Sequence, residues 1–482
     1  MKAILNKINY PILSVVLFLL IAITTLFVKP IIGMADNGDY YRIISQNDLY
    51  HLEQDDEDKF FGYFSKEYGI YQYNNETEAT MISTQTVFIK VAKFIDTLFT
   101  KDYKFDIRVM AIIFLIIQAF ALYLITKVFL YEINNNIYKL IIVVLTTFIF
   151  SDTAYLAYYN SFYGEAVMIC CFLYSIGIIL YMCKFNKFTV CNLILFGIST
   201  LLFFGAKQQL APIGILASIL LIRIAYLNKE IKIRITSIVL TIIFIFSSVY
   251  FYKSITGDFD YINRYHAMTR GILLDESNPD EILKSFDIYY QYSLLENEIF
   301  FQTIPMINPN DEKLKDEFYS KYSVFNILIY YIKNPKSLIK MTDLAFKNAY
   351  SIRPKAMGNY EKSEGKEFGE MSNYFTLWST FKENVLPKGM VMSIIYILLY
   401  LVIAYKRYKK ALFNRDNNSV LVEEIFIYVL LAGLSQIFAS IVGAGDADLA
   451  KHVFMYNLSF DLMILYTISN VLKNKDNKRR EN

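Results

Sequence analysis

The residues best suited to chemistry lie directly after the first long apolar run of the chain. The stretch Ala-Asp-Asn-Gly-Asp-Tyr-Tyr-Arg places Asp36 and Asp39 three positions apart and Arg42 three positions later. Gly38, between the two acids, permits a sharp bend of the backbone. A carboxylate can accept a proton from an attacking hydroxyl, and an arginine can hold a phosphate. The same residues would also form a turn followed by a helix N-cap, so their surroundings must decide.

Three other polar links between apolar runs, residues 151–165, 205–209 and 443–452, carry similar groups. Their candidate substrate-binding residues, together with one cation of a later polar segment, are Asp152, Asn160, Tyr163, Glu165, Lys207, Gln208, Arg353, Lys451 and His452. When a sugar is transferred from a lipid phosphate, the phosphate is already a good leaving group. The transfer therefore needs one base and no general acid. Cations would stabilise the charge that develops on the phosphate.

Ordinary structural roles are also open to several of these residues. Glu165 begins an apolar run, where an acid complements the dipole of a helix. Lys207 would suit snorkelling to the membrane interface, and His452 would suit contact with lipid headgroups. Asp461 differs from all of them because it lies well inside the last apolar run. A buried acid is costly there, so it requires a partner and is a functional candidate.

The elements that must position these residues are membrane-spanning helices. The chain has 482 residues, 55% of them hydrophobic and 17% aromatic, and apolar runs of spanning length recur along it. We expect an all-α polytopic fold with ten spans, at about 11–28, 107–130, 139–151, 165–183, 189–204, 210–227, 235–252, 389–405, 421–442 and 453–472. The net charge of +3 gives no reason to expect a nucleic-acid partner.

The distribution of basic residues predicts the topology. Lysines and arginines gather in the links between alternate spans and in the tail: Lys184, Lys187, Arg223, Lys229, Lys232, Arg234, Lys406, Arg407, Lys409, Lys410, Arg415, Lys473, Lys475, Lys478, Arg479 and Arg480. By the positive-inside rule, these segments face the cytoplasm. We therefore expect a multi-pass protein of the cell membrane with both termini in the cytoplasm, and the polar links named above on the outer face.

Two long polar segments divide the chain into five parts. These are a first span (1–29), a first outer loop (30–106), six spans (107–252), a large and mostly helical outer segment (253–388), and three spans with a basic tail (389–482). Near the end of the first outer loop, apolar residues from Val87 to Phe99 recur at helical spacing, which indicates a helix along the membrane surface. Val324 to Ile332 is too short to span and indicates a buried or surface-lying helix.

This arrangement resembles the GT-C class of membrane glycosyltransferases. The resemblance rests on the acidic motif after the first span, the first outer loop with its surface helix, and the large outer segment after the seventh span. Three stretches, 35–42, 160–165 and 353–361, resemble more narrowly the bacterial WsfD-type glycan hexose transferases. The resemblance implies that Asp36 or Asp39 is the catalytic base, and that Asp152 or Glu165 supports the substrate or a metal. The Asp36-x-x-Asp39 spacing departs from the DxD-like pair common in the class, so a divalent cation is left open.

These observations predict an inverting glycosyltransferase that moves a sugar from a polyprenyl-phosphate donor to a glycan or glycopolymer acceptor at the cell surface. Membrane lipids would surround it. A transporter or flippase of lipid-linked glycans is an alternative, and so is a polymerase or ligase of such glycans. Of the two acids, Asp36 is favoured as the base because it is closer to the span.

Overall fold

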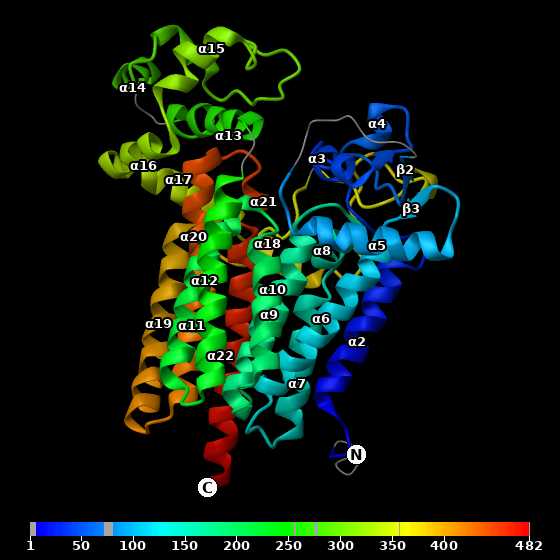
Figure 1. Ribbon diagram of the computed structural model, residues 1–482, viewed down its shortest axis with the longest axis vertical. Helices are drawn as coiled ribbons and strands as arrows, with labels where there is room; N and C mark the ends of the chain where they lie inside the picture. Colours follow the sequence, from blue (N-terminus) through cyan, green and yellow to red (C-terminus); the bar gives the residue numbers. More distant parts are fainter. Residues whose placement is uncertain (1–5, 72–80, 255–256, 275–277, 356, 482) are drawn as a thin grey trace.

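A computed structural model describes residues 6–71, 81–254, 257–274, 278–355 and 357–481 of the chain. Its largest part is a bundle of long helices that run roughly side by side (Figure 1). These are α2 (Tyr10–Leu26), α6 (Arg108–Phe129), α7 (Asn136–Phe150), α9 (Glu165–Phe185), α10 (Val190–Phe204), α11 (Ala211–Leu227), α12 (Ile231–Lys253), α19 (Met390–Phe413), α20 (Asn417–Ala444) and α22 (Phe454–Glu481). The prediction of a predominantly helical chain is confirmed.

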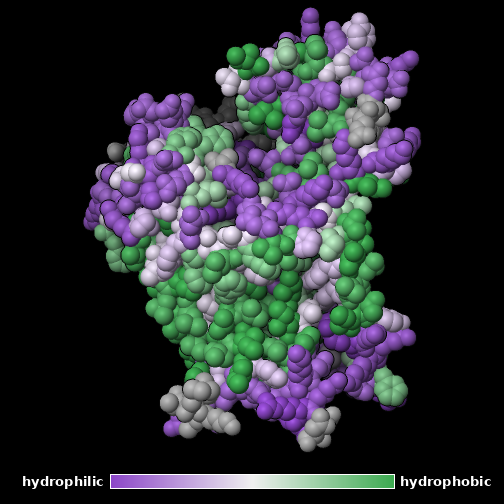
Figure 2. Space-filling model, turned by 180° about the vertical axis from the view of Figure 1, so that it is seen from behind, coloured by the Kyte–Doolittle hydropathy of each residue, from purple (hydrophilic) through white to green (hydrophobic). Residues whose placement is uncertain are grey.

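The bundle has the surface of a membrane protein. Figure 2 shows a belt of hydrophobic residues around its middle, with hydrophilic residues above and below. Among the described residues, six helices (α6, α9, α11 with its preceding turn, α12, α19 and α20) are long and apolar enough to span a membrane. A seventh span results if α7 and the segment Thr153–Asn160, which meet at a bend of 46°, are counted together. The ten crossings expected from the sequence therefore stay a prediction, although helices lie near all ten predicted ranges.

The start of α2 and the end of α22 lie at one end of the bundle, and both large polar segments lie at the other (Figure 1). The first segment contains α3 (Tyr41–Ile44), α4 (Asp56–Lys59) and α5 (Gln85–Phe99). It also contains an antiparallel sheet of β1 (Leu49–His51), β2 (Glu67–Ile70) and β3 (Lys104–Asp106), in that order. This small sheet departs from the all-α prediction.

The helix α5 lies across the polar end of the bundle (Figure 1). It buries Phe88, Ile89 and Ala92, while Phe94 and Leu98 on another face are exposed. Hydrogen bonds from Ser83 and Thr84, just before the helix, reach carbonyls of residues 206 and 202 at the end of α10. A helix is therefore found where the sequence indicated one on the membrane surface.

The second polar segment contributes to two hydrophobic cores. Its helices are α13 (Gly257–Thr269), α14 (Pro279–Ser285), α15 (Glu312–Glu317), α16 (Val324–Lys333), α17 (Pro335–Asn348) and α18 (Leu377–Asn384). Residues from Tyr265 to Tyr350 form a core of their own that also includes Ile437 and Phe460 of the bundle. From Ile352 to Trp378 the segment contributes instead to the main core, which joins the bundle and the first polar segment. The change of core between these residues lies close to the candidate site.

Candidate functional site

The acidic motif is held in an extended segment between two other parts of the chain. The amide of Gly33 donates to the carbonyl of Asn359 at 3.1 Å, and the amide of Ala35 donates to the carbonyl of Gly358 at 2.9 Å. On the other side, the Tyr163 hydroxyl lies 2.9 Å from the carbonyl oxygen of Ala35. The three stretches that resemble the WsfD-type transferases thus meet in space, although they are far apart in the sequence.

Two of the predicted binding residues hold this assembly together from within. The side-chain amide of Asn160 donates to the carbonyls of Leu26 and Ile32, at 3.1 and 2.8 Å, where the chain leaves α2. Arg353 donates to the side chain of Asn359 and, at 2.8 Å, to the carbonyl of Ser372. Both residues therefore position the motif through the backbone, and neither reaches the acidic side chains.

The Asp36 carboxylate is fully engaged in the fold. Its Oδ1 accepts from the amides of Gly38 and Tyr40, at 2.8 and 3.1 Å, which fixes the turn that follows. Its Oδ2 lies 3.1 Å from Nε2 of His51, and only 1% of the side chain is exposed. Gly38 has φ +93°, a conformation that a glycine adopts readily. Asp36 thus shapes the turn that presents Asp39.

His51 is a residue of this site that the sequence pattern did not reveal. It ends β1, and its ring lies between the Asp36 carboxylate and Glu53, whose Oε2 is 3.6 Å from Nδ1. Burial lowers the pKa of His51, but the hydrogen bond with Asp36 and the nearby Glu53 carboxylate outweigh it and raise the pKa to about 8. An isolated histidine in a polar loop carries no periodic signal, and the pairing depends on the unpredicted sheet.

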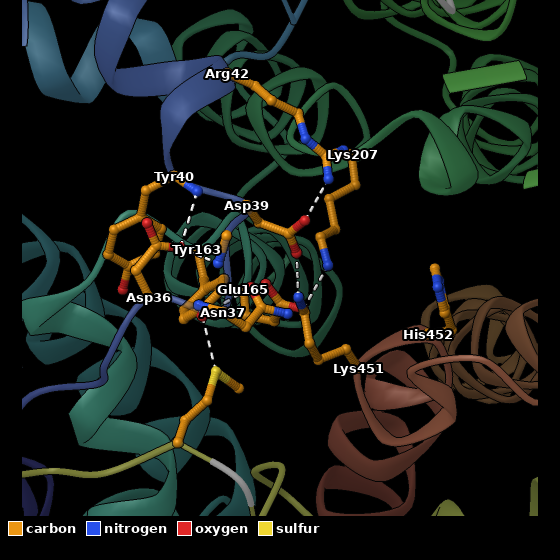
Figure 3. Close-up of polar contacts among 12 residues, drawn as sticks. Asp36, Asn37, Asp39, Tyr40, Arg42, Tyr163, Glu165, Lys207, Lys451 and His452 are labelled. Atoms are coloured by element: carbon orange, nitrogen blue, oxygen red, sulfur yellow. Dashed lines mark hydrogen bonds and ion pairs between the residues drawn. The ribbon is translucent and has the colours of Figure 1, made fainter. Parts of the chain in front are cut away.

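Asp39 lies at the centre of a cluster of charged side chains (Figure 3). Its two oxygens form ion pairs with Arg42 and Lys451, which come from opposite ends of the chain. The side-chain amide of Asn37 satisfies its hydrogen bonds when its nitrogen faces Asp39. In this orientation the nitrogen donates to Asp39 Oδ2 at 3.1 Å, and the Asn37 oxygen accepts from Lys451 at 3.0 Å. Burial raises the pKa of Asp39, but Lys451 and Arg42 outweigh it and hold this pKa far below its usual range. About a third of the Asp39 side chain (34%) is exposed.

A second ion pair borders the first. Lys207 donates to Oε1 of Glu165 at the start of α9, and Oε2 of this fully buried carboxylate has no hydrogen-bond partner among the described residues. Lys451 of the first pair extends over the ring of Tyr163, 4.8 Å from its centre, and is close enough to Glu165 of the second pair for their charges to interact. The cluster, defined as Asp39, Arg42, Glu165, Lys207 and Lys451, holds three cations and two carboxylates. It therefore carries an excess positive charge suited to an anion.

Three other predicted residues turn away from this charged cluster. The ring of His452 bonds to Gln209 at 2.8 Å and lies apart from the cluster (Figure 3). Gln208 donates to the carbonyl of Tyr252 at 2.7 Å. Asp152 caps α8 (Thr153–Leu156), accepting from the Ala154 amide at 2.9 Å, and also binds Ser379. Within the described residues their contacts are structural ones.

Asp461, the acid inside the last apolar run, is also satisfied internally. Lys382 of α18 lies 2.7 Å from one oxygen of Asp461 and 2.8 Å from the other. Both side chains are fully buried. Trp378 and Tyr155 donate to the same carboxylate at 2.9 and 2.6 Å. This network fixes α18 to α22 and requires no ligand.

Metal-ligating residues are not gathered in the described part of the chain, where no three His, Cys, Asp or Glu side chains are grouped to hold an ion. Asp39 in particular already faces two cations. The cluster therefore suits an anionic ligand better than a cation.

Thermal stability should fall as the pH rises from about 6 to 9, in part because of His51. A histidine whose pKa is raised from 6.5 to about 8 on folding stabilises the protein fully below pH 6.5 and loses that contribution as pH passes about 8. The difference corresponds to about 2 kcal/mol. Thermal unfolding in detergent across this range should show the decline for the wild type and a flatter profile for His51→Gln. An equal decline in both would contradict this role.

Comparison with known proteins identifies relatives of this chain. The family model described as YfdI N-terminal transmembrane domain matches residues 1–482. The uncharacterized protein YfdI of Escherichia coli is 25% identical over 376 residues, which cover 75% of this chain and 75% of that protein. No solved structure matches. Together with the apolar helices, the family match confirms a transmembrane protein.

Proposed function

We propose that this chain, which belongs to the YfdI N-terminal transmembrane domain family, is an inverting membrane glycosyltransferase of GT-C type. It would move a sugar from a polyprenyl-phosphate donor to a surface glycan or glycopolymer on the outer face of the membrane. The observation that carries the proposal is the Asp39 carboxylate between Arg42 and Lys451, at the polar end of an apolar bundle. A phosphate on a membrane lipid would reach this depth with its sugar beside a carboxylate.

The reaction assigns a role to each part of the charged cluster. The acceptor oxygen forms a bond to the anomeric carbon while the bond from that carbon to the phosphate oxygen breaks. The electron pair of the broken bond leaves with the phosphate, and Lys451, Lys207 and Arg42 neutralise the charge. The proton of the acceptor hydroxyl passes to Asp39. Attack opposite the leaving group inverts the configuration of the sugar.

Donor binding would also prepare the base. Without a phosphate, Arg42 and Lys451 keep the pKa of Asp39 low, and such a carboxylate is a weak base. A phosphate that draws these cations away would raise the pKa of Asp39 at the moment when a base is needed. Asp36 cannot take this role without unmaking its bonds to Gly38, Tyr40 and His51. We therefore assign the base to Asp39 and the positioning of its turn to Asp36.

The proposed orientation follows from the charges at the two ends of the bundle. The charged cluster lies at one end of the bundle. The basic links and the tail lie at the opposite end, which contains the start of α2 and the end of α22. By the positive-inside rule this end faces the cytoplasm. The charged cluster then faces outward, where an acceptor glycan is present.

The direct test is transfer of labelled hexose from polyprenyl-phosphate donors by the full chain in vesicles, with cell-envelope glycan as acceptor. Lys451→Gln should raise the donor KM by about 10–100-fold, the effect of losing one charged hydrogen bond to phosphate. Lys321→Gln, which removes a lysine paired with Asp287 at the surface, is the matched control and should leave the KM unchanged. Movement of lipid-linked sugar across the vesicle without transfer would support a flippase instead and refute the proposal.

A further inference from the structure

A cavity of about 360 Å³, lined mostly by polar residues, lies between the end of α17 and the link after α20 and has no role in the scheme above. Its walls include Asn348 at the end of α17, Ser351 and Arg353 of the following segment, and Asp446 and Asp448 of the link after α20. We call it the junction pocket, because the chain changes from one hydrophobic core to the other between Tyr350 and Ile352. Ligands commonly bind where two packed units meet.

Both walls of the junction pocket are connected to the reacting residues. Leu449 and Ala450 line one wall, and the next residue is Lys451, which pairs with Asp39. The opposite wall, at Arg353, leads to the segment whose backbone binds Gly33 and Ala35. A ligand in the pocket would therefore contact the residues that directly precede Lys451 and the start of the segment that holds the acidic motif.

The cations that line the junction pocket are already paired or bonded. Lys355 forms an ion pair with Glu383 at 2.7 Å, and Arg353 donates to Asn359 and Ser372. Asp446 is likewise paired, with Arg270 at 2.7 and 2.9 Å. A phosphate in this pocket would have to displace these partners, so the pocket is poorly suited to the donor headgroup.

The groups that remain uncommitted are hydrogen-bond acceptors. The Asp448 carboxylate makes no hydrogen bond or ion pair with another described residue, and the same holds for the side-chain oxygens of Ser351 and Asn348. The Asp448 carboxylate can accept hydrogen bonds from the hydroxyl groups of a neutral sugar and repels phosphate, and the Ser351 hydroxyl can accept or donate. The volume suits a single hexose unit with room for its linkage, since ligand pockets begin at about 300 Å³.

We propose that the junction pocket binds the acceptor, as a neutral hexose unit whose hydroxyl is presented toward Asp39. This inference rests on the proposed function, because it names the acceptor class of the same site. It also divides the site by charge. The cations of the charged cluster bind the phosphate of the donor, while the hydrogen-bonding oxygens of the junction pocket bind the hydroxyl groups of the glycan.

Two substitutions probe the pocket at residues that are not members of the charged cluster. Asp448→Asn removes the charge and keeps a residue type that tolerates the left-handed conformation found there, with φ +46°. Ser351→Leu narrows the cavity. Asp287→Asn is the matched control, because Asp287 also has a left-handed backbone, at φ +57°, and is a surface residue outside the junction pocket.

Saturation-transfer NMR would measure the binding of methyl hexosides to the full chain in detergent. Labelled polyprenyl-phosphate hexose would be used to measure sugar transfer and donor hydrolysis. We expect both pocket variants to weaken hexoside binding and raise the acceptor KM at least about tenfold, with donor hydrolysis unchanged and the control like wild type. If both variants bind hexosides and transfer sugar like the wild type, the junction pocket is not the acceptor site, although the proposed function would stand. A different result would overturn the proposed function and keep the sugar site. In that case the wild type would bind hexosides but neither transfer sugar nor hydrolyse the donor, and the variants would weaken the binding.

Discussion

Replacing Asp39 by asparagine should lower sugar transfer by about 10²–10⁴-fold, the usual contribution of a positioned general base. The substitution keeps the size of the side chain and removes its ability to accept a proton. The new amide offers one oxygen and no negative charge to Arg42 and Lys451, so it holds these cations less strongly and donor binding should persist or tighten. The loss should therefore appear in kcat and not in the donor KM.

Asp36→Asn is the matched comparison because it makes the same chemical change three residues away. This variant keeps a side-chain oxygen for the amides of Gly38 and Tyr40 but loses a carboxylate oxygen for His51. We expect a clearly smaller loss of kcat than for Asp39→Asn, together with a lower thermal midpoint. The reverse order, with Asp36→Asn inactive and Asp39→Asn near the wild-type rate, would return the role of base to Asp36.

The sequence was most informative about which segments form helices. All ten predicted apolar ranges contain a helix, because a run of apolar residues at spanning length has few other ways to satisfy its backbone. The topology argument also placed Lys451 and Asp39 at one end of the bundle, and the structure brings their side chains into contact across 412 positions of sequence.

Side-chain roles at the site were less predictable. Asn160, Asp152 and Arg353 have residue types that would suit substrate binding, yet each bonds to the protein itself. Composition cannot separate a polar group that meets a ligand from one that meets a backbone carbonyl. His51 was missed for the opposite reason, since only the pairing of β1 with β2 places it beside Asp36.

Lys382→Met should destabilise the protein by about 3–5 kcal/mol, the cost of leaving one partner of a buried ion pair uncompensated. Lys382 and Asp461 are both fully buried, and after the substitution the carboxylate would keep only the donors from Trp378 and Tyr155. The expected result is a large drop in the thermal midpoint of the purified protein in detergent.

The double variant Lys382→Met with Asp461→Leu distinguishes a structural pair from a functional one. Removing both charges replaces a desolvated pair by apolar groups, so most of the lost stability should return. Because neither residue reaches the charged cluster, the double variant should also keep sugar transfer near the wild-type rate. A stable double variant that has lost sugar transfer would give Asp461 a part in the reaction. Recovery of both stability and transfer means that this acid has a structural role. It fixes α18 against α22, so that the segment before α18 can hold the Asp39 turn.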